Sequence, residues 1–286
     1  MPRLGNRTAE GYFWPMPIAR LDDRAVIAVS GPEAKTFLQG LITNDVEMLD
    51  RHHAIYAALL TPQGKILFDF LVTAEDGGLL LDCMAGAREA LIKRLTMYKL
   101  RAKVQLVPRD DLAVVAAWGG GLEMESLEEF GFRDPRHPEL GARAITLKDA
   151  IAPRHDDYLS HRLALGIPEG ADFGSDKMFA LDADLDELHA VSFDKGCYVG
   201  QELTARMKHR GTARKRLLPV TAATPLPAPG IAIRAGAQEI GEVASAYGLQ
   251  GFALVRLDRL EEAADAPLTA DGSIGIVLRR PQWLSA

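Results

Sequence analysis

The residues with the clearest chemical potential surround Cys197, in the stretch KGCYVGQE that covers 195–202. A helix predicted over 201–207 would direct its positive N-terminal end towards the Cys197 thiol, and Lys195 would add an ammonium group nearby. Both features favour the thiolate over the thiol. Cys197 is therefore a candidate reactive or metal-binding thiol. The alternative is a small buried residue in a glycine-rich turn.

Composition limits the class of protein. The chain has 286 residues, 48% hydrophobic and 25% charged, with a formal net charge of −6. This length predicts two or three soluble domains, and the mild negative charge argues against direct binding of nucleic acid. Two cysteines cannot form a disulfide-rich scaffold or a four-cysteine zinc site within one chain, and they suit a reducing compartment.

The N-terminal region lacks the continuous apolar segment of a signal peptide, and no apolar run is long enough for a membrane span. We therefore expect a cytoplasmic protein that does not bind a membrane. Residues 1–15 should form a loose tail, and Met16 is an alternative start residue.

The first predicted α+β segment positions two candidate site residues. Asn44 ends the first helix in a polar turn, either as turn chemistry or on the rim of a cavity. Asp69 interrupts an apolar strand, where it either faces outward or needs a buried partner. Cys83 lies in another apolar strand and is predicted to be a core residue. Strands are expected over 25–29, 54–60, 65–73 and 79–84, and helices over 32–41 (with a Ser30 to Glu33 capping box) and 87–100.

A second α+β segment and a C-terminal barrel follow. The second segment should have strands over 111–118 and 142–147, helices over 123–130 and 156–165, and an irregular acidic stretch over 168–188. Short β-type runs after residue 216, separated by Pro- and Gly-rich turns, predict a small β-barrel. The predicted domains are 16–108, 109–211 (which includes the cysteine motif) and 212–286.

A basic tract begins inside the predicted motif helix. No acidic residue occurs over 203–238, while cations are frequent over 206–216, and a second basic group occurs over 88–103. These cations either form a solvated surface or attract an anion such as the glutamate tail of a folate, or an acidic partner.

The sequence resembles the YgfZ/GcvT-type folate-binding family, and more narrowly its branch of iron–sulfur cluster assembly factors. The resemblance rests on KGCYVGQE and its continuation LTARMKHRGTARKRLLPV. It is supported by GPEAKTFLQGLITNDV over 31–46, GIPEG over 166–170 and GEVASA over 241–246. It implies an α+β protein of the aminomethyltransferase type, a three-domain clover-leaf with two α+β domains and a C-terminal barrel. Tetrahydrofolate or a derivative would occupy a central channel.

Two positions depart from the related glycine-cleavage T-protein. Its paired aspartates correspond here to Phe68 and Asp69, so one carboxylate remains. The glutamate that binds the pterin ring in T-proteins corresponds to Ala164, which cannot accept hydrogen bonds from the ring. Both departures argue against aminomethyl transfer.

Three functions remain open. The first is a folate-binding accessory protein for assembly or repair of iron–sulfur clusters, with Cys197 as the thiol and Lys195 lowering its pKa. The second is a folate-dependent methyl- or aminomethyltransferase that uses Asp69 as acid or base. The third is a scaffold with a vestigial folate pocket. These alternatives do not decide whether the protein is an enzyme, although a non-enzymatic role is favoured. The predicted folate contacts are Asn44, Asp69, Tyr198, Gln201, Arg206 and Arg214. For Tyr198 the alternative is packing in the core.

One cysteine cannot hold a cluster alone, because iron–sulfur clusters generally need about four protein ligands. Cys197 is therefore expected to share a cluster with a partner, a second protomer or a small thiol, and we expect no tightly bound metal in the isolated chain. His209 is either a second ligand or a surface residue. The expected partners are folate, assembly proteins and client iron–sulfur enzymes.

Overall fold

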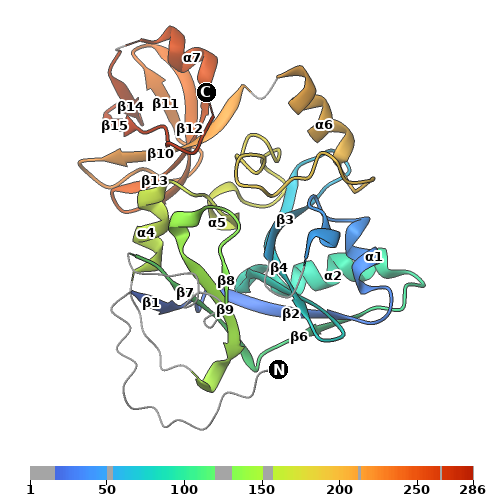
Figure 1. The fold of residues 1–286 in the computed structure, drawn as a ribbon. Coiled ribbons are helices and arrows are strands. Elements are labelled where there is room, and N and C mark those ends of the chain that lie inside the picture. The colour runs from blue at the N-terminus through green and yellow to red at the C-terminus, as the bar shows by residue number, and fades with distance from the viewer. Residues whose placement is uncertain are drawn as a thin grey trace.

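The computed structural model describes residues 17–49, 54–119, 131–150, 157–211, 214–264 and 266–285. The predicted tail over 1–15 and the predicted helix over 123–130 lie outside these ranges. In Figure 1 the described chain forms two sheets and a barrel that surround a central segment with little regular structure.

The first sheet has five antiparallel strands in the order β3-β4-β5-β2-β6. Side chains alternate across it, so that Val26 and Ala28 enter one apolar cluster whereas Ile27 and Val29 enter another. Both faces of this sheet are therefore buried. Its strands are β2 (Arg24–Ser30), β3 (Ala54–Leu60), β4 (Ile66–Glu75), β5 (Gly78–Met84) and β6 (Gln105–Pro108).

Helices α1 (Ala34–Gln39) and α2 (Arg88–Lys99) cover the second face of this sheet. The predicted capping box is wrong. Glu33 occupies the N-cap of α1 without a side-chain cap bond, and its carboxylate instead accepts a hydrogen bond from the backbone N–H of Lys103. Helix α1 consequently begins two residues later than predicted, because a long-range partner takes the capping group.

The second sheet has four strands in the order β1-β7-β9-β8. Strand β1 pairs with β7, so the first described strand belongs to the second sheet, whereas the predicted ranges placed it in the first domain. The strands of the second sheet are β1 (Ile18–Arg20), β7 (Leu112–Ala117), β8 (Phe132–Arg133) and β9 (Ala142–Leu147). Helix α4 (Tyr158–Leu165) follows and ends at Gly166, as predicted.

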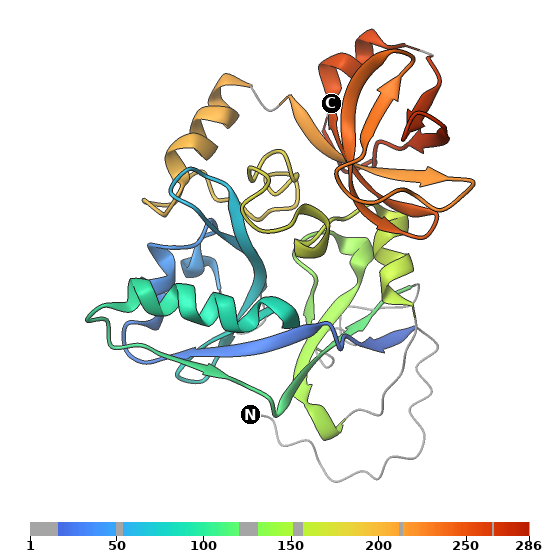
Figure 2. The ribbon, with the colours of Figure 1, turned by 180° about the vertical axis from the view of Figure 1, so that it is seen from behind.

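The C-terminal region is a closed barrel with the strand order β10-β13-β12-β11-β14-β15, which confirms the predicted barrel. Figure 2 shows this barrel beside the two sheets, with α6 reaching towards it from the first sheet. Its strands are β10 (Lys215–Ala222), β11 (Ala232–Ala235), β12 (Gln238–Tyr247), β13 (Gln250–Arg256), β14 (Leu268–Ala270) and β15 (Ile274–Leu278), and α7 is Leu257–Glu262.

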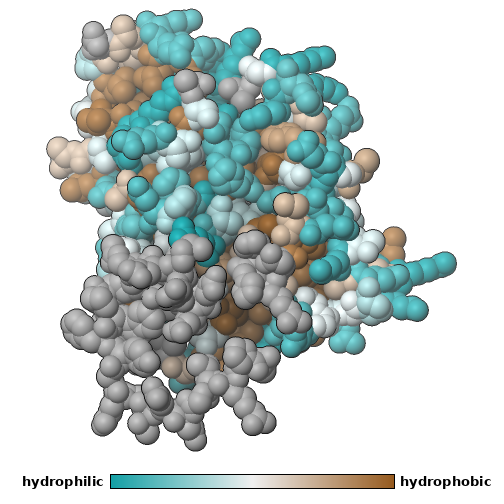
Figure 3. Space-filling view, in the orientation of Figure 1, coloured by the Kyte–Doolittle hydropathy of each residue, from teal (hydrophilic) through white to brown (hydrophobic). Residues whose placement is uncertain are grey.

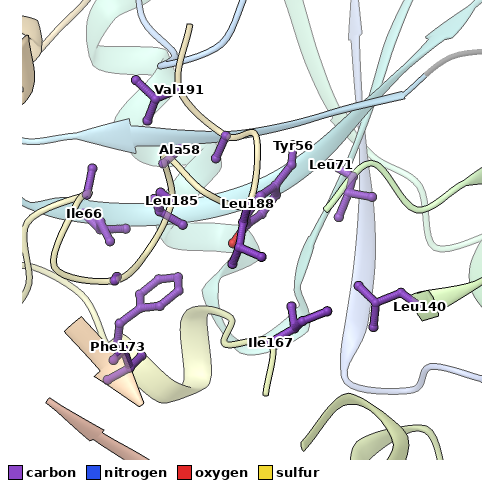
Figure 4. Packing of buried hydrophobic residues seen from close by; sticks show 14 of the residues in the cluster. Tyr56, Ala58, Ile66, Leu71, Leu140, Ile167, Phe173, Leu185, Leu188 and Val191 are labelled. Carbon is purple, nitrogen blue, oxygen red and sulfur yellow. The ribbon is translucent and has the colours of Figure 1, made fainter. Parts of the chain in front are cut away.

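A central segment over 167–200 links all three units. It contains only α5 (Gly170–Phe173) before α6 (Gln201–Arg210), which extends three residues beyond the predicted motif helix. Figure 4 shows Phe173, Leu185 and Leu188 from this segment packed near Tyr56 and Ile66 of the first sheet. The same cluster reaches Phe252 in the barrel, so the units share one apolar core.

The remaining helical turns are short 3-10 helices: η1 (Val46–Met48), η2 (Ala85–Ala87), η3 (Pro138–Leu140) and η4 (Lys148–Ala150). Within the described ranges, no helix has the length and apolar character needed to cross a membrane.

Candidate functional site

Cys197 is exposed, whereas Cys83 is buried in β5, and both are free thiols. Cys83 is 1% exposed within an apolar cluster, which confirms its prediction as a core residue, and burial raises the pKa of its thiol to about 12. Cys197 lies four positions before Gln201, the first residue of α6. The accessible thiol therefore belongs to a loop over 193–200, called here the motif loop.

The motif loop is fixed by Gly200 at its C-terminal end. Gly200 has φ +83°, and a Cβ there would lie 2.5 Å from the Thr61 carbonyl oxygen and 2.9 Å from the Leu60 Cβ. Only glycine permits this backbone to approach the hairpin between β3 and β4 so closely. Tyr198 is also buried, so both residues hold the loop while Cys197 stays outside.

Lys195 anchors the other side of the loop. Its Nζ donates hydrogen bonds to the carbonyl oxygens of Gln39 at 2.8 Å, Ile42 at 2.9 Å and Asn44 at 2.7 Å. The ammonium also lies 5.4 Å from the centre of the Tyr198 ring. Burial lowers the pKa of Lys195 to about 8.

These contacts give Lys195 a structural role in addition to its predicted effect on the thiol. An ammonium has three N–H donors, and here all three are directed at carbonyls near the end of α1. None is left for the Cys197 thiol. Lys195 therefore fixes the loop that presents Cys197, and α6 begins four residues after the thiol.

Asn44 also has a structural role in this arrangement. Its amide nitrogen donates to the carbonyls of Tyr56 and His189, both at 2.7 Å, and its side-chain oxygen accepts from the Asp45 N–H at 2.8 Å. The bond to Asp45 is turn chemistry, and the other two tie the turn to β3 and to the central segment. Because its polar atoms already have partners, Asn44 is a poor candidate for the predicted folate contact.

The basic tract of α6 and β10 is partly neutralised within the protein. Arg206 pairs with Glu202 at 2.6 Å, and Lys208 pairs with Asp186 at 3.0 Å. Arg216 also pairs with Asp186, at 2.9 Å. The acidic part of the central segment therefore supplies counter-charges, and the tract offers less free positive charge than its sequence suggests.

The predicted folate contacts do not converge. Gln201 and Tyr198 lie at the start of α6 and Arg206 lies one turn later, whereas Arg214 lies at the entry to the barrel, where its carbonyl accepts the Leu257 N–H. Asp69 lies elsewhere, facing a cavity on the first sheet. The structure therefore separates the set into the motif loop, an exposed helix surface and the Asp69 cavity.

Asp69 is buried and only 4% exposed, so the outward-facing alternative is wrong. One of its carboxylate oxygens accepts a 2.9 Å hydrogen bond from the Tyr56 hydroxyl. Burial is the main cause of a raised pKa at Asp69. A buried carboxyl with a perturbed pKa beside a cavity is a feature that acid and base catalysts share.

Asp69 lines a cavity of about 250 Å³ between β4, β5 and α5. Phe68 lies on its wall, so a phenyl ring stands where T-proteins have their second carboxylate. Gly170 faces Asp69 so closely that a Cβ would lie 2.4 Å from the carboxylate. Ala164 is exposed and does not line this cavity. The other wall residues are Leu67, Cys83, Met84, Gly86, Ala87, Phe173, Gly174 and Ser175.

A set of buried charges behind Asp69 was missed by the sequence analysis. The set, called here the central ion network, contains four arginines and four carboxylates: Arg24, Asp82, Asp134, Arg136, Arg143, Arg162, Glu169 and Asp172. Every side chain in it is at most 9% exposed. The signal that could have indicated this network was the presence of charged residues inside apolar strands, such as Asp82 in LLLDCM.

Arg143 is central to this network. Its guanidinium donates to Asp82 at 2.7 Å, Asp134 at 2.9 Å and the Tyr158 hydroxyl at 3.1 Å. The arginines hold the pKa of Asp134 at about 2 despite burial, and they hold that of Glu169 well below its usual range. These carboxylates are therefore ionised, and the network joins the first and second sheets.

The network also reaches the barrel. Asp172 in α5 accepts hydrogen bonds from Ser245 at 2.6 Å and Tyr247 at 3.0 Å, both in β12. It pairs with Arg162 of α4 at 2.6 Å. The network consequently connects all three units beside the Asp69 cavity.

Comparison with known proteins identifies the family. Residues 214–286 match the family model described as CAF17, C-terminal beta-barrel domain. The mouse protein named iron-sulfur cluster assembly factor IBA57, mitochondrial, is 34% identical over 98% of this chain and 88% of its own length. The human protein of the same name is 33% identical, over 92% of this chain and 84% of its own length.

The chain belongs to the IBA57 family. This confirms the branch indicated by the cysteine motif. The predicted cytoplasmic location is wrong by this comparison, because these IBA57 relatives are named as mitochondrial proteins, which points to the mitochondrion.

The predicted fold of this IBA57-family chain is also confirmed. It superposes on the glycine cleavage system aminomethyltransferase T from Bartonella henselae with a TM-score of 0.70, over 93% of this chain and 86% of the other. The two sequences are 19% identical, so this likeness establishes the aminomethyltransferase fold and not the reaction.

Proposed function

We propose that this protein assists the assembly or repair of iron–sulfur clusters in client enzymes, with Cys197 as a thiolate ligand shared with a partner. The cluster is the cargo in this function. The names of the IBA57 relatives support the general role. The partner is an assembly protein or a client enzyme.

The observation that carries the proposal is an exposed thiol on a loop held at both ends. Lys195 binds three carbonyls on one side of Cys197, and Gly200 packs against the Thr61 carbonyl on the other. A ligand held in place loses little conformational freedom when it binds a metal. A cysteine needed only for packing would be buried, as Cys83 is.

The remaining ligands must come from outside this chain. The residues described by the structure contain no group of three or more metal-ligating side chains. His209 is exposed in the last turn of α6, eight residues after Gln201. At about 1.5 Å per residue it lies roughly 12 Å along the helix from its start, too far to share a metal ion with Cys197. A second protein or a small thiol therefore completes the coordination.

The test replaces Cys197 in cells that lack their own copy of the protein. Cys197→Ser should reduce client iron–sulfur enzyme activities by at least tenfold while leaving the thermal unfolding midpoint unchanged. Gly196→Ala is the matched control, because its Cβ would meet no atom within 4 Å. Full enzyme activity with Cys197→Ser would overturn the role of the thiol.

The Asp69 cavity supports folate binding as a second part of the proposal. Its apolar walls, formed by residues such as Leu67, Phe68 and Phe173, suit an aromatic ring, and the Asp69 carboxyl suits the polar edge of a pterin. At about 250 Å³ it has room for a ring system and not for a whole folate, so the tail would lie outside. When bound, the folate would supply one-carbon chemistry.

Calorimetric titration with tetrahydrofolate tests this part separately. Binding should weaken at least tenfold in Gly170→Ala, whose Cβ would collide with Asp69 and Met84. Gly86→Ala, a wall position with open space around its Cβ, is the control. Absence of heat at millimolar ligand would favour the scaffold with a vestigial pocket.

A one-carbon transferase is the second candidate function, favoured by the raised pKa of Asp69 beside the cavity. Its test is incubation of the protein with tetrahydrofolate and an aminomethyl-loaded lipoyl carrier. Turnover that disappears in Asp69→Asn would establish transfer. The replacement of the second carboxylate by Phe68 leads us to expect no turnover.

A further inference from the structure

Helix α2 ends in an unusual backbone conformation at Leu100. This residue has φ +43° and ψ −104° at the C-cap, where helices commonly place glycine or asparagine. A bulky residue at positive φ is strained. The leucine side chain is nevertheless 89% exposed, so burial in the core does not explain why leucine occupies this position.

Leu100 continues an exposed stripe along α2. Lys93, Met97 and Leu100 are spaced i, i+4 and i+7, which places them on one face of the helix. Met97 is 63% exposed. The helix buries different residues, Leu91 and Leu95, against the first sheet. The outward stripe is therefore additional to the packing that holds α2 in place.

This stripe lies in a basic region that contains no acidic residue over 90–109. In the described part of the chain, none of its cations at 93–103 forms an ion pair, in contrast to the tract of α6 and β10. The α2-end surface is defined here as Lys93, Arg94, Met97, Lys99, Leu100, Arg101 and Lys103.

The α2-end surface projects from the molecule. Hydrophilic side chains extend from the edge at which α2 ends, in the space-filling view of Figure 3. In both Figure 1 and Figure 2, helices α6, α1 and the C-terminal end of α2 follow one another along this same edge. The surface therefore lies on the side of the protein that carries the start of α6.

We propose that the α2-end surface docks an acidic segment of a partner protein, with an apolar partner side chain packed on Met97 and Leu100. Unpaired exposed cations attract and orient carboxylates, and a small apolar centre within a charged rim is the usual composition of a transient protein interface. We identify this partner with the protein that shares a cluster with Cys197, because the α2-end surface and the start of α6 lie on the same side of the molecule. This link rests on the proposed function.

A protein is favoured over a membrane surface by the arrangement of apolar residues. Interfacial helices insert a broad apolar face into lipid. Helix α2 instead turns its main apolar residues, Leu91 and Leu95, into the core. Two exposed apolar side chains are a small contact, suited to one pocket on a protein.

Photo-crosslinking in cells tests the docking surface. A benzoylphenylalanine replaces Met97, and the crosslinked partner peptide is identified by mass spectrometry. The same probe replaces Leu249, an exposed apolar residue of the barrel, as the positional control. We expect an Asp- and Glu-rich peptide at position 97 alone. The pair Lys93→Glu with Arg101→Glu should weaken this crosslink at least tenfold, and Arg234→Glu on the barrel should not.

A charge exchange makes the assignment specific. Changing the carboxylates of the captured peptide to lysine should restore the crosslink to the Lys93→Glu, Arg101→Glu protein. Leu100→Gly should also weaken the crosslink severalfold while raising the thermal unfolding midpoint, because glycine relieves the strained conformation. Loss of binding in a more stable protein cannot result from unfolding.

Several outcomes would overturn the proposal. These are no crosslink from position 97, a crosslink to a second copy of this chain, no recovery after charge exchange, or charge-dependent binding to vesicles of phosphatidylcholine and phosphatidylglycerol. Cys197→Ser should leave the crosslink unchanged. If Cys197→Ser also leaves client enzymes active, the proposed function fails while the docking surface stands.

Discussion

The central ion network and the α2-end surface contain charged side chains in opposite surroundings. In the network, each arginine lies against carboxylates with almost no exposure to solvent. On the α2-end surface, the cations are without ion pairs in the described structure and face water. The difference teaches that burial and pairing, rather than the number of charges, decide whether a charged group stabilises a fold or remains free for recognition.

The largest expected effect is at the centre of the network. Arg143→Ala would leave Asp82 and Asp134 buried with a lost partner, and breaking such a pair costs about 3–5 kcal/mol. Urea unfolding would measure this loss in free energy of unfolding. The matched control is Arg206→Ala, which removes a 2.6 Å pair with Glu202 at the surface and should cost under about 1 kcal/mol. Equal losses of unfolding free energy in the two variants would contradict the distinction between buried and exposed ion pairs.

A second prediction concerns the pH dependence of stability, because two buried carboxyl groups have pKa values shifted in opposite directions. Arginines lower the pKa of Asp134 to about 2, whereas burial raises that of Asp182 to about 6. Stability from Asp134 is present above its unfolded pKa near 4 and is lost as pH falls from about 4 to 2. Asp182 binds its proton more tightly when folded, so its contribution decreases as pH rises from about 4 to 6.

Asp182→Asn should isolate the second contribution. The variant should be more stable than the parent at pH 7, by about 1–3 kcal/mol, and close to it at pH 4. Urea unfolding midpoints measured at intervals from pH 4 to 7 would show this divergence. Parallel curves for the two proteins would contradict an elevated pKa at Asp182.

A smaller effect, a gain in stability, is expected at Leu100 where α2 ends. Leu100→Gly removes the cost of a bulky residue at positive φ, and the free energy of unfolding should rise by about 1 kcal/mol. Thermal unfolding by calorimetry would detect the shift. Leu249→Gly is the control, since Leu249 does not have a positive φ. A decrease in stability would show that Leu100 supports the fold.

The smallest effect should come from reversing charge on the α2-end surface. Lys93→Glu with Arg101→Glu removes no ion pair of the described structure, so unfolding free energy should change by less than about 0.5 kcal/mol. Urea unfolding of this double variant and of Arg143→Ala would compare the α2-end surface with the central ion network on one stability scale. A loss of several kcal/mol would show that these cations are structural.

Local patterns in the sequence were enough to predict much of the fold. The hairpin of β3 and β4, the helix α4 ending at Gly166 and the barrel strands other than β14 were predicted from apolar periodicity and turn residues. These features depend on residues close in the chain. The family motif then led to the aminomethyltransferase fold, which the structural likeness confirms.

Partners far apart in the chain could not be predicted in the same way. Lys195 is separated by more than 150 residues from each carbonyl that it binds, and no local rule distinguishes those carbonyls from the Cys197 thiol. Glu33 fits a capping box, yet the Lys103 N–H takes its carboxylate. A polar group binds whichever partner the fold brings near it.

The sequence by itself determined the family, the candidate thiol and the succession of two α+β units and a barrel, because these follow from local periodicity and a specific motif. Only the tertiary structure decided which charges are free. It paired Lys208 and Arg216 with Asp186, buried Arg143 between Asp82 and Asp134, and left Lys93, Arg101 and Lys103 exposed without an ion pair in the described structure. Pairing depends on distance in space and on exclusion of water, and the spacing of residues along the chain encodes neither.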